Sequence, residues 1–215
     1  MNEKVQKRKL GKLSKAGIIG GIVALCLALG AAYFFAFGSI RGDGKVVTQE
    51  RKVEVFSAIE LSGDYTANIH FGKSNGVSVT TDGNLQKHIK VEVSDSVLSI
   101  SFIDTNFKPI MSTKLVVDIT MPEISSLDIS GAANVTFDEG SALELKLAAS
   151  GSCSIDAQKY QVKNVIVNFS GSANAKIWVT EALSGDASGA GSIHYKGDPK
   201  SVDVDTSGVF SVNQL

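Results

Sequence analysis

The chain has 215 residues, a formal net charge of −1, 21 glycines and only 3 prolines. Its densest basic cluster lies within the first 15 residues, so the sequence lacks the basic stripe with interleaved aromatics that a nucleic-acid-binding surface would need. Roughly 170 residues follow the N-terminal apolar segment, which is enough for a single domain.

The N-terminus joins a basic segment to an uncharged one. Residues 1–15 carry six Lys and Arg, and residues 16–37 carry no charge. At about 1.5 Å per residue, such a stretch spans a hydrocarbon core of about 30 Å. Because basic residues stay on the cytoplasmic side, we predict a single-pass protein with its N-terminus inside: a cytoplasmic tail over 1–15, a transmembrane helix or uncleaved signal anchor over 16–38, a linker over 39–45 and an extracytoplasmic domain over 46–215.

The alternative for this segment is a cleaved signal peptide. Ala36-Phe37-Gly38 offers a small-x-small cleavage site, although a secretory apolar region is usually only about 7–15 residues long. A lipoprotein is disfavoured because Leu25, rather than a small residue, precedes Cys26. We therefore expect Cys26 to face lipid or a packing helix.

The middle of the chain contains alternating segments without an obvious repeat. We predict strands over residues 66–71, 77–81, 89–93, 97–102 and 115–120, because apolar and polar residues alternate in each. We interpret them as wider and less regular coils of the same solenoid. Residues 85–88 and 104–109 would project as loops, which either carry binding specificity or only connect strands.

The second half of the chain repeats a Ser-Gly pair at intervals of 18 to 20 residues, between short alternating strands. This period is typical of a parallel β-helix, whose coils stack about 4.8 Å apart and bury a core that no single coil could bury. Glycine supplies the unusual φ of each corner, and serine hydrogen-bonds the backbone there. With an earlier pair at 62–63, the predicted corner residues are Ser62, Gly63, Ser130, Gly131, Ser150, Gly151, Ser170, Gly171, Ser188, Gly189, Ser207 and Gly208.

The second residue after the corner glycine is small in several coils and large in the last one. Cys153 aligns with Ala133, Ala173 and Gly191, so we interpret this cysteine as a small inward-facing residue. Phe210 occupies the same position in the last coil, where we predict that its ring covers the end of the core as a plug. The alternative is that this end docks another subunit or partner.

Candidates for metal binding and catalysis are few. Asp186, Asp203 and Asp205 are weak Ca²⁺ candidates because adjacent coils could bring their carboxylates together, but a solvated acidic face explains them better. The three histidines, at positions 70, 88 and 194, share no zinc-ligand spacing. We predict no catalytic residue, no cofactor and no firm metal site.

Residues 42–53 (GDGKVVTQERKV) and 56–63 (FSAIELSG) resemble the opening of the head GIN domain, an autotransporter-adhesin family of unknown function, and the later Ser-Gly coils resemble its repeats. The resemblance covers residues 45–215. It implies an all-β, single-stranded, right-handed parallel β-helix (a β-solenoid) on a bacterial cell surface, and it brings no catalytic residues. Many relatives carry a plain signal or lipoprotein sequence, whereas we expect a helical anchor here. The integrin-type tripeptide Arg41-Gly42-Asp43 overlaps this opening close to the membrane, and we interpret it as chance.

The sequence thus predicts a membrane-anchored extracytoplasmic binding module of adhesion type, without catalytic activity, whose ligand would be an envelope glycan or a surface protein. One alternative is a carbohydrate-active β-helix enzyme acting on an envelope or extracellular polysaccharide. The return loops over 138–142, 158–163 and 197–201 are short for the walls of its cleft. Another alternative is an envelope signalling or assembly subunit that uses the basic tail inside the cell. The oligomeric state is left open.

Overall fold

The computed structural model describes residues 38–106 and 108–215. One short 3₁₀ helix, η1 (Gly83–His88), interrupts the strands of this part of the chain. The strands are β1 (Ile40–Arg41), β2 (Val46–Arg51), β3 (Ala58–Phe71), β4 (Gly76–Asp82), β5 (Ile89–Ser94), β6 (Val97–Phe102), β7 (Ile110–Met111), β8 (Leu115–Met121), β9 (Ser126–Phe137), β10 (Gly140–Lys196) and β11 (Ser201–Gln214). The five strands predicted between residues 66 and 120 are therefore confirmed.

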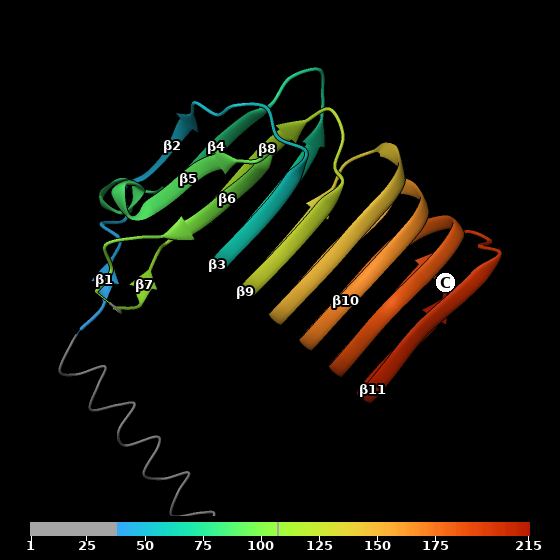
Figure 1. Cartoon of the computed structure of the whole chain (residues 1–215). Helices are drawn as coiled ribbons and strands as arrows, with labels where there is room; N and C mark the ends of the chain where they lie inside the picture. Colours follow the sequence, from blue (N-terminus) through green and yellow to red (C-terminus); the bar gives the residue numbers. More distant parts are fainter. Residues whose placement is uncertain (1–37, 107) are drawn as a thin grey trace, which may run out of the picture.

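Most strands belong to one nine-stranded sheet with the order β11-β10-β9-β3-β8-β4-β2, to which β6 is added beside β3 and β5 beside β6. β1 and β7 form a separate two-stranded pair. In Figure 1 the long bent strands β9, β10 and β11 lie side by side toward the C-terminus, while β2, β4, β5, β6 and β8 gather at the other end.

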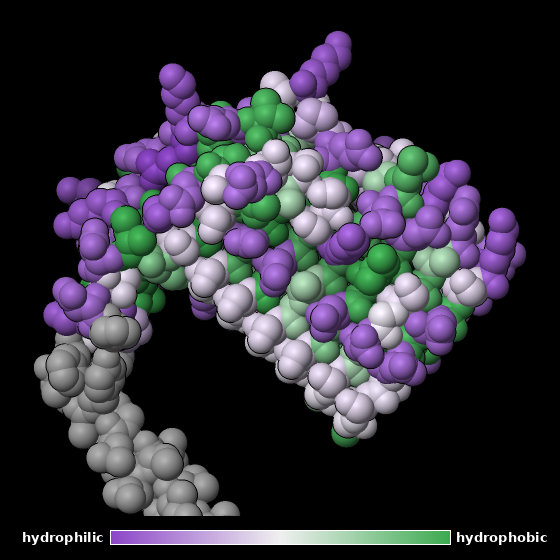
Figure 2. Space-filling model, in the orientation of Figure 1, coloured by the Kyte–Doolittle hydropathy of each residue, from purple (hydrophilic) through white to green (hydrophobic). Residues whose placement is uncertain are grey.

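The bent strands stack in a register that follows the Ser-Gly pairs. Ser130 of β9 pairs with both Ser62 of β3 and Ser150 of β10, and all three strands run parallel. Gly131 has a φ of 126°, and a Cβ there would lie 2.4 Å from the carbonyl oxygen of Gly63. Only glycine tolerates this φ and this approach of the neighbouring backbone. Figure 2 shows pale residues of intermediate hydropathy in a row along one edge of the stacked strands.

The predicted fold class is wrong. A single-stranded right-handed parallel β-helix has parallel neighbours throughout, whereas β4 runs antiparallel to β2 and β8, and β5 runs antiparallel to β6. Asp95 and Ser96 both have positive φ, 51° and 63°, and the β5–β6 register closes directly around them at Ser94 and Val97. Two such residues make a tight hairpin turn, so the chain reverses where the prediction placed wider coils. The result is a mixed sheet.

Most of the predictions for the N-terminus concern residues that the structure does not describe. The tail over 1–15 and the transmembrane helix over 16–38 lie outside the described residues, except for Gly38. Within residues 38–106 and 108–215, no helix has the length and apolarity needed to cross a membrane.

The core lies on the inner side of the bent strands. In β9 the buried residues alternate with outward ones on both sides of the corner, as a strand with one buried face requires. Cys153 is 6% exposed and pairs in register with Ala133, so its interpretation as a small inward residue is confirmed. Burial raises the pKa of its thiol.

Candidate functional site

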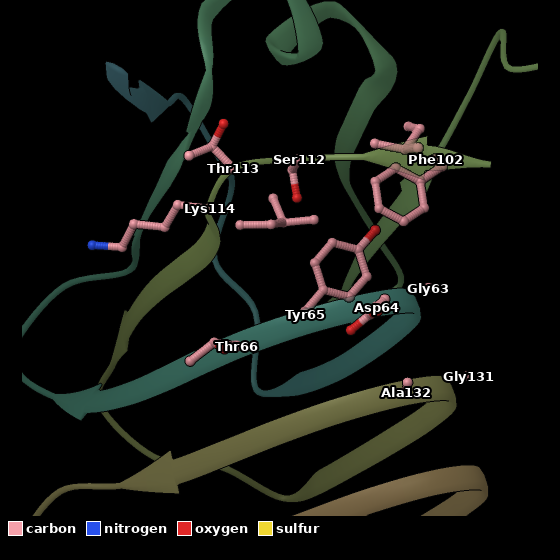
Figure 3. A pocket seen from close by; sticks show the side chains of 12 residues that line it. Gly63, Asp64, Tyr65, Thr66, Phe102, Ser112, Thr113, Lys114, Gly131 and Ala132 are labelled. Atoms are coloured by element: carbon pink, nitrogen blue, oxygen red, sulfur yellow. The ribbon is translucent and has the colours of Figure 1, made fainter. Parts of the chain in front are cut away.

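A hollow of about 500 Å³ lies where the stacked strands meet the mixed part of the sheet. Asp64, Tyr65 and Thr66 of β3 line one side, next to the corner of β9 at Gly131 and Ala132. Phe102 at the end of β6, Ile110 of β7 and residues 112–115, which lead into β8, line the other. Figure 3 shows these side chains converging from strands that are far apart in the sequence. We call this site the Tyr65 hollow.

Two stacked aromatic rings lie at the base of the Tyr65 hollow. The rings of Tyr65 and Phe102 lie 5.2 Å apart between centroids at an interplanar angle of 12°, and Tyr65 is only 2% exposed. The Tyr65 hydroxyl donates a hydrogen bond to the carbonyl oxygen of Ser62 at 3.2 Å. Burial, together with the negative charge of Asp64, raises the pKa of this hydroxyl, so Tyr65 is a neutral donor rather than a base.

The rim of the hollow is polar and carries one charge of each sign. Asp64 and Thr66 on β3 and Thr113 and Lys114 on the opposite connection are all exposed. In Figure 3 Thr113 and Lys114 lie to the left of the aromatic pair, and Asp64 and Thr66 lie on the strand below it. An aromatic base with a few polar groups at the rim is typical of a site that binds and orients a ligand.

A buried carboxylate holds one wall of the hollow in place. Asp82 accepts hydrogen bonds from the Thr113 N–H at 2.7 Å and from the Thr113 hydroxyl at 2.8 Å, and from the Gly44 N–H at 2.8 Å. The bonds from Thr113, followed by that from Gly44, lower the pKa of Asp82. The ionised side chain therefore ties β4 to Gly44, which precedes β2, and to the β7–β8 connection.

The same region fixes the Arg41-Gly42-Asp43 tripeptide. Asn84 of η1 donates a side-chain hydrogen bond to the Arg41 carbonyl at 2.7 Å and accepts one from the Asp43 N–H at 3.0 Å. The Gly42 N–H bonds to the Met111 carbonyl oxygen at 2.9 Å. The tripeptide backbone is thus held against η1 and β7 instead of forming a free loop.

The two segments predicted to project as loops differ in the structure. Residues 104–109 lie next to the hollow, whereas residues 85–88 belong to η1. Residues 104–109 connect Phe102 to Ile110, both of which line the hollow, and Asp104 has a positive φ of 54°. The expectation that 85–88 projects is wrong, because Leu85 and Gln86 are 0% and 5% exposed. The apolar Leu85 side chain joins the core, and the Gln86 amide donates to the Val47 and Val79 carbonyls, which ties β2 to β4.

The weak Ca²⁺ candidates are only partly brought together. Asp186 pairs in register with Asp205, whereas Asp203 pairs with Ser184. Within residues 38–106 and 108–215, no group of three or more His, Cys, Asp and Glu side chains is placed to hold a metal ion.

The six predicted corner glycines all have positive φ, between 82° at Gly208 and 140° at Gly63.

Sequence reasoning missed the two residues at the base of the hollow. Tyr65 pairs in register with Ala133, at the position where the following coils carry Ala, Cys or Gly and only the last carries Phe210. A large ring in a column of small residues was the available signal that the core widens there. Sequence reasoning considered His70 only as a zinc ligand and missed its carboxylate partners: its Nδ1 lies 2.6 Å from Asp138 and its Nε2 lies 3.6 Å from Asp118.

The chain matches one family in sequence, and it is similar to several solved structures. The family described as "Putative auto-transporter adhesin, head GIN domain" matches residues 55–140 and 137–199. A "putative adhesin" from Bacteroides fragilis is similar with a TM-score of 0.54 and 18% identity, over 82% of this chain and 100% of that one. Another from Parabacteroides distasonis has a TM-score of 0.44 and 20% identity over 82% and 100% of the two chains. A third, from Parabacteroides merdae, has a TM-score of 0.42 and 20% identity over 82% and 99%. No curated protein matches the chain.

Proposed function

Since this chain belongs to the family described as "Putative auto-transporter adhesin, head GIN domain", we propose that it is a non-catalytic binding module of adhesion type that acts outside the cytoplasmic membrane. The observation that carries the proposal is the Tyr65 hollow. Its base is a stacked aromatic pair and its rim offers Asp64, Thr66 and Lys114 to a ligand. We propose an envelope glycan or a surface protein as that ligand.

Substitutions at the rim test this site. Ala132→Trp places a large ring at a position that lines the hollow, and it should weaken binding of intact cells to the purified target surface by at least about tenfold. Ser172→Trp is the matched control, since Ser172 follows the corner glycine of a later pass and does not line the hollow. Lys114→Glu should weaken binding without changing the thermal midpoint, because Lys114 is exposed. If Ala132→Trp and Lys114→Glu both bind as the wild type and the Ser172→Trp control do, the Tyr65 hollow is not the binding site.

The proposal includes attachment to the cell through the N-terminal segment. Six cationic residues precede the uncharged stretch over residues 16–37, which supports an inside N-terminus and an outside domain. Protease treatment of intact cells should then remove the domain. Survival of the domain after this treatment, or its release into the medium with a new N-terminus near Ser39, would contradict anchoring.

A binding role suits the Tyr65 hollow better than the carbohydrate-active alternative. Glycoside hydrolysis uses a pair of facing carboxyl groups. Asp64 is the one carboxylate among the described residues that line this hollow. The side chains there are therefore suited to holding a ligand rather than to proton transfer. The signalling or assembly alternative depends on the basic tail, which lies outside the described residues.

A further inference from the structure

Trp178 is the single tryptophan of the chain, and it lies on a face of β10 that shares no lining residue with the Tyr65 hollow. Its neighbours Ile177 and Val179 are 1% and 0% exposed. Because successive side chains of a strand point to opposite sides, the indole points outward, and it is half-buried. A large aromatic ring is thus presented at the surface.

The indole lines a hollow of about 320 Å³. The other lining residues are Glu139, Gly140, Lys159, Gln161 and Lys196. The Lys196 ammonium lies over the indole, 4.1 Å from the ring centroid. Within the described residues, neither Lys159 nor Lys196 lies within 4.0 Å of a carboxylate. Two ammonium groups without an acidic partner therefore line the same hollow as the indole, and one of them lies over its ring.

A second hollow of about 420 Å³ continues this surface and shares Gln161 with the first. Leu143, which is 66% exposed, lines it. Lys163 lines it as well, and this lysine is already paired with Glu181 at 3.3 Å. The surface can thus accommodate an extended ligand, with its unpaired positive charges concentrated around Trp178.

We propose that the Trp178 hollow binds an acidic saccharide. The C–H face of a pyranose ring would stack on the indole, whose flat apolar surface suits it. A ring carboxylate would pair with Lys159 and Lys196 through charge-assisted hydrogen bonds, and the Lys196 ammonium would turn from the indole toward this carboxylate. Gln161 and Glu139 would hydrogen-bond the sugar hydroxyls. The site is additional to the Tyr65 hollow and gives the molecule a second, chemically different contact with its surroundings.

The charges around Trp178 favour a saccharide over a single-stranded nucleic acid. A nucleic acid also stacks its bases on aromatic rings, but it needs a continuous positive groove along its phosphates. Here Glu139 lies in the hollow itself, and Glu123 lies in the adjoining one. The carboxylates of an acidic saccharide are set one to a sugar ring and are separated by neutral hydroxyl groups, so they fit this alternation of signs better.

The intrinsic fluorescence of the full chain in detergent micelles tests the proposal, because every tryptophan signal comes from Trp178. Trigalacturonate should give a saturable change, and a neutral galactose trisaccharide should give a change at least about tenfold weaker in affinity. Lys159→Met and Lys196→Met should each weaken trigalacturonate binding at least about tenfold. Lys87→Met, an exposed lysine of η1, is the matched control. Ala132→Trp adds a second tryptophan, so its binding is read by calorimetry and should equal that of the wild type.

Three outcomes would overturn the proposal. These are the absence of a saturable change with trigalacturonate, unchanged affinity in both lysine variants, and a stronger response to a short oligothymidylate than to trigalacturonate. Because cell attachment is measured separately on the Ala132→Trp variant, a failure at Trp178 leaves the proposed function of the Tyr65 hollow standing.

Discussion

The carboxylate of Asp82 holds both the N–H and the hydroxyl of Thr113, at 2.7 Å and 2.8 Å. Asp82 is fully buried, and it ends β4, whereas Thr113 precedes β8 and lines the Tyr65 hollow. The position of this wall of the Tyr65 hollow therefore depends on the protonation state of Asp82.

The first prediction is that acid removes the stability that Asp82 gives to this wall of the Tyr65 hollow. The fold lowers the pKa of Asp82 below its ordinary value of 3.8, so its stabilising contribution is complete above that value. The contribution is lost as the pH falls through the lower folded pKa. Urea unfolding should show that Asp82→Asn is less stable than the wild type at pH 7 but loses less stability on acidification. Asp128→Asn, on an exposed face of β9, should retain the wild-type response to acid. Identical acid responses of Asp82→Asn and the wild type would disprove this role.

The second prediction concerns the corners. Gly171 has a φ of 115°, and a Cβ there would lie 2.5 Å from the carbonyl oxygen of Gly151. Gly171→Val should therefore lower the free energy of unfolding by at least ~2 kcal/mol. Asn168→Thr, at an exposed position of the same pass, should change it by less than ~0.5 kcal/mol. Denaturant midpoints compare the two, and equal effects would mean that the corner is not a steric constraint.

The repeat pattern could be read from the sequence because it depends on local chemistry. Alternating burial and the glycine corners need only neighbouring residues, and Ser130 pairs with Ser62 and Ser150 as their shared pattern suggests. The fold class failed where this pattern was extended into residues that do not carry it. Asp95 and Ser96 make a hairpin with positive φ at residues other than glycine, and such a turn is hard to recognise from composition alone.

The candidate site could not be derived from the sequence because its contacts are long-range. Tyr65 meets Phe102 only because β6 pairs with the first half of β3 while β8 pairs with the second half. That division of one strand between two neighbours follows from the hairpin and not from a period in the sequence. Trp178 was visible as the single tryptophan, but its lysine neighbours come from other passes of β10.

The third prediction is that the contribution of His70 to stability depends on pH with a sign opposite to that of Asp82. The hydrogen bond to Asp138 is the largest cause that raises the pKa of His70, and Asp118 adds to it. The contribution of His70 to stability is therefore complete below its ordinary value of 6.5 and is lost as the pH rises through the raised folded pKa. Because the side chain is 40% exposed, the loss should be no more than ~1 kcal/mol. Urea midpoints at pH 5.5 and pH 8.5 should differ more for the wild type than for His70→Gln. A difference that His70→Gln leaves unchanged would assign the effect to another group.

The last prediction concerns the C-terminal end of the sheet. Phe210 of β11 pairs in register with Gly191, and its ring packs against Phe169 at 6.3 Å between centroids. The ring is only partly buried, so Phe210→Ala should lower the free energy of unfolding by ~1–3 kcal/mol, less than the ~3–5 kcal/mol of a fully buried ring. Val209→Ala should be nearly neutral, because Val209 is 81% exposed. β11 also has β10 as its single partner within the described residues, which leaves one backbone edge open. Sedimentation therefore separates the two roles of Phe210. A lower unfolding midpoint without a change of mass supports a plug within one chain, and a change of mass at a constant midpoint assigns the ring to an interface.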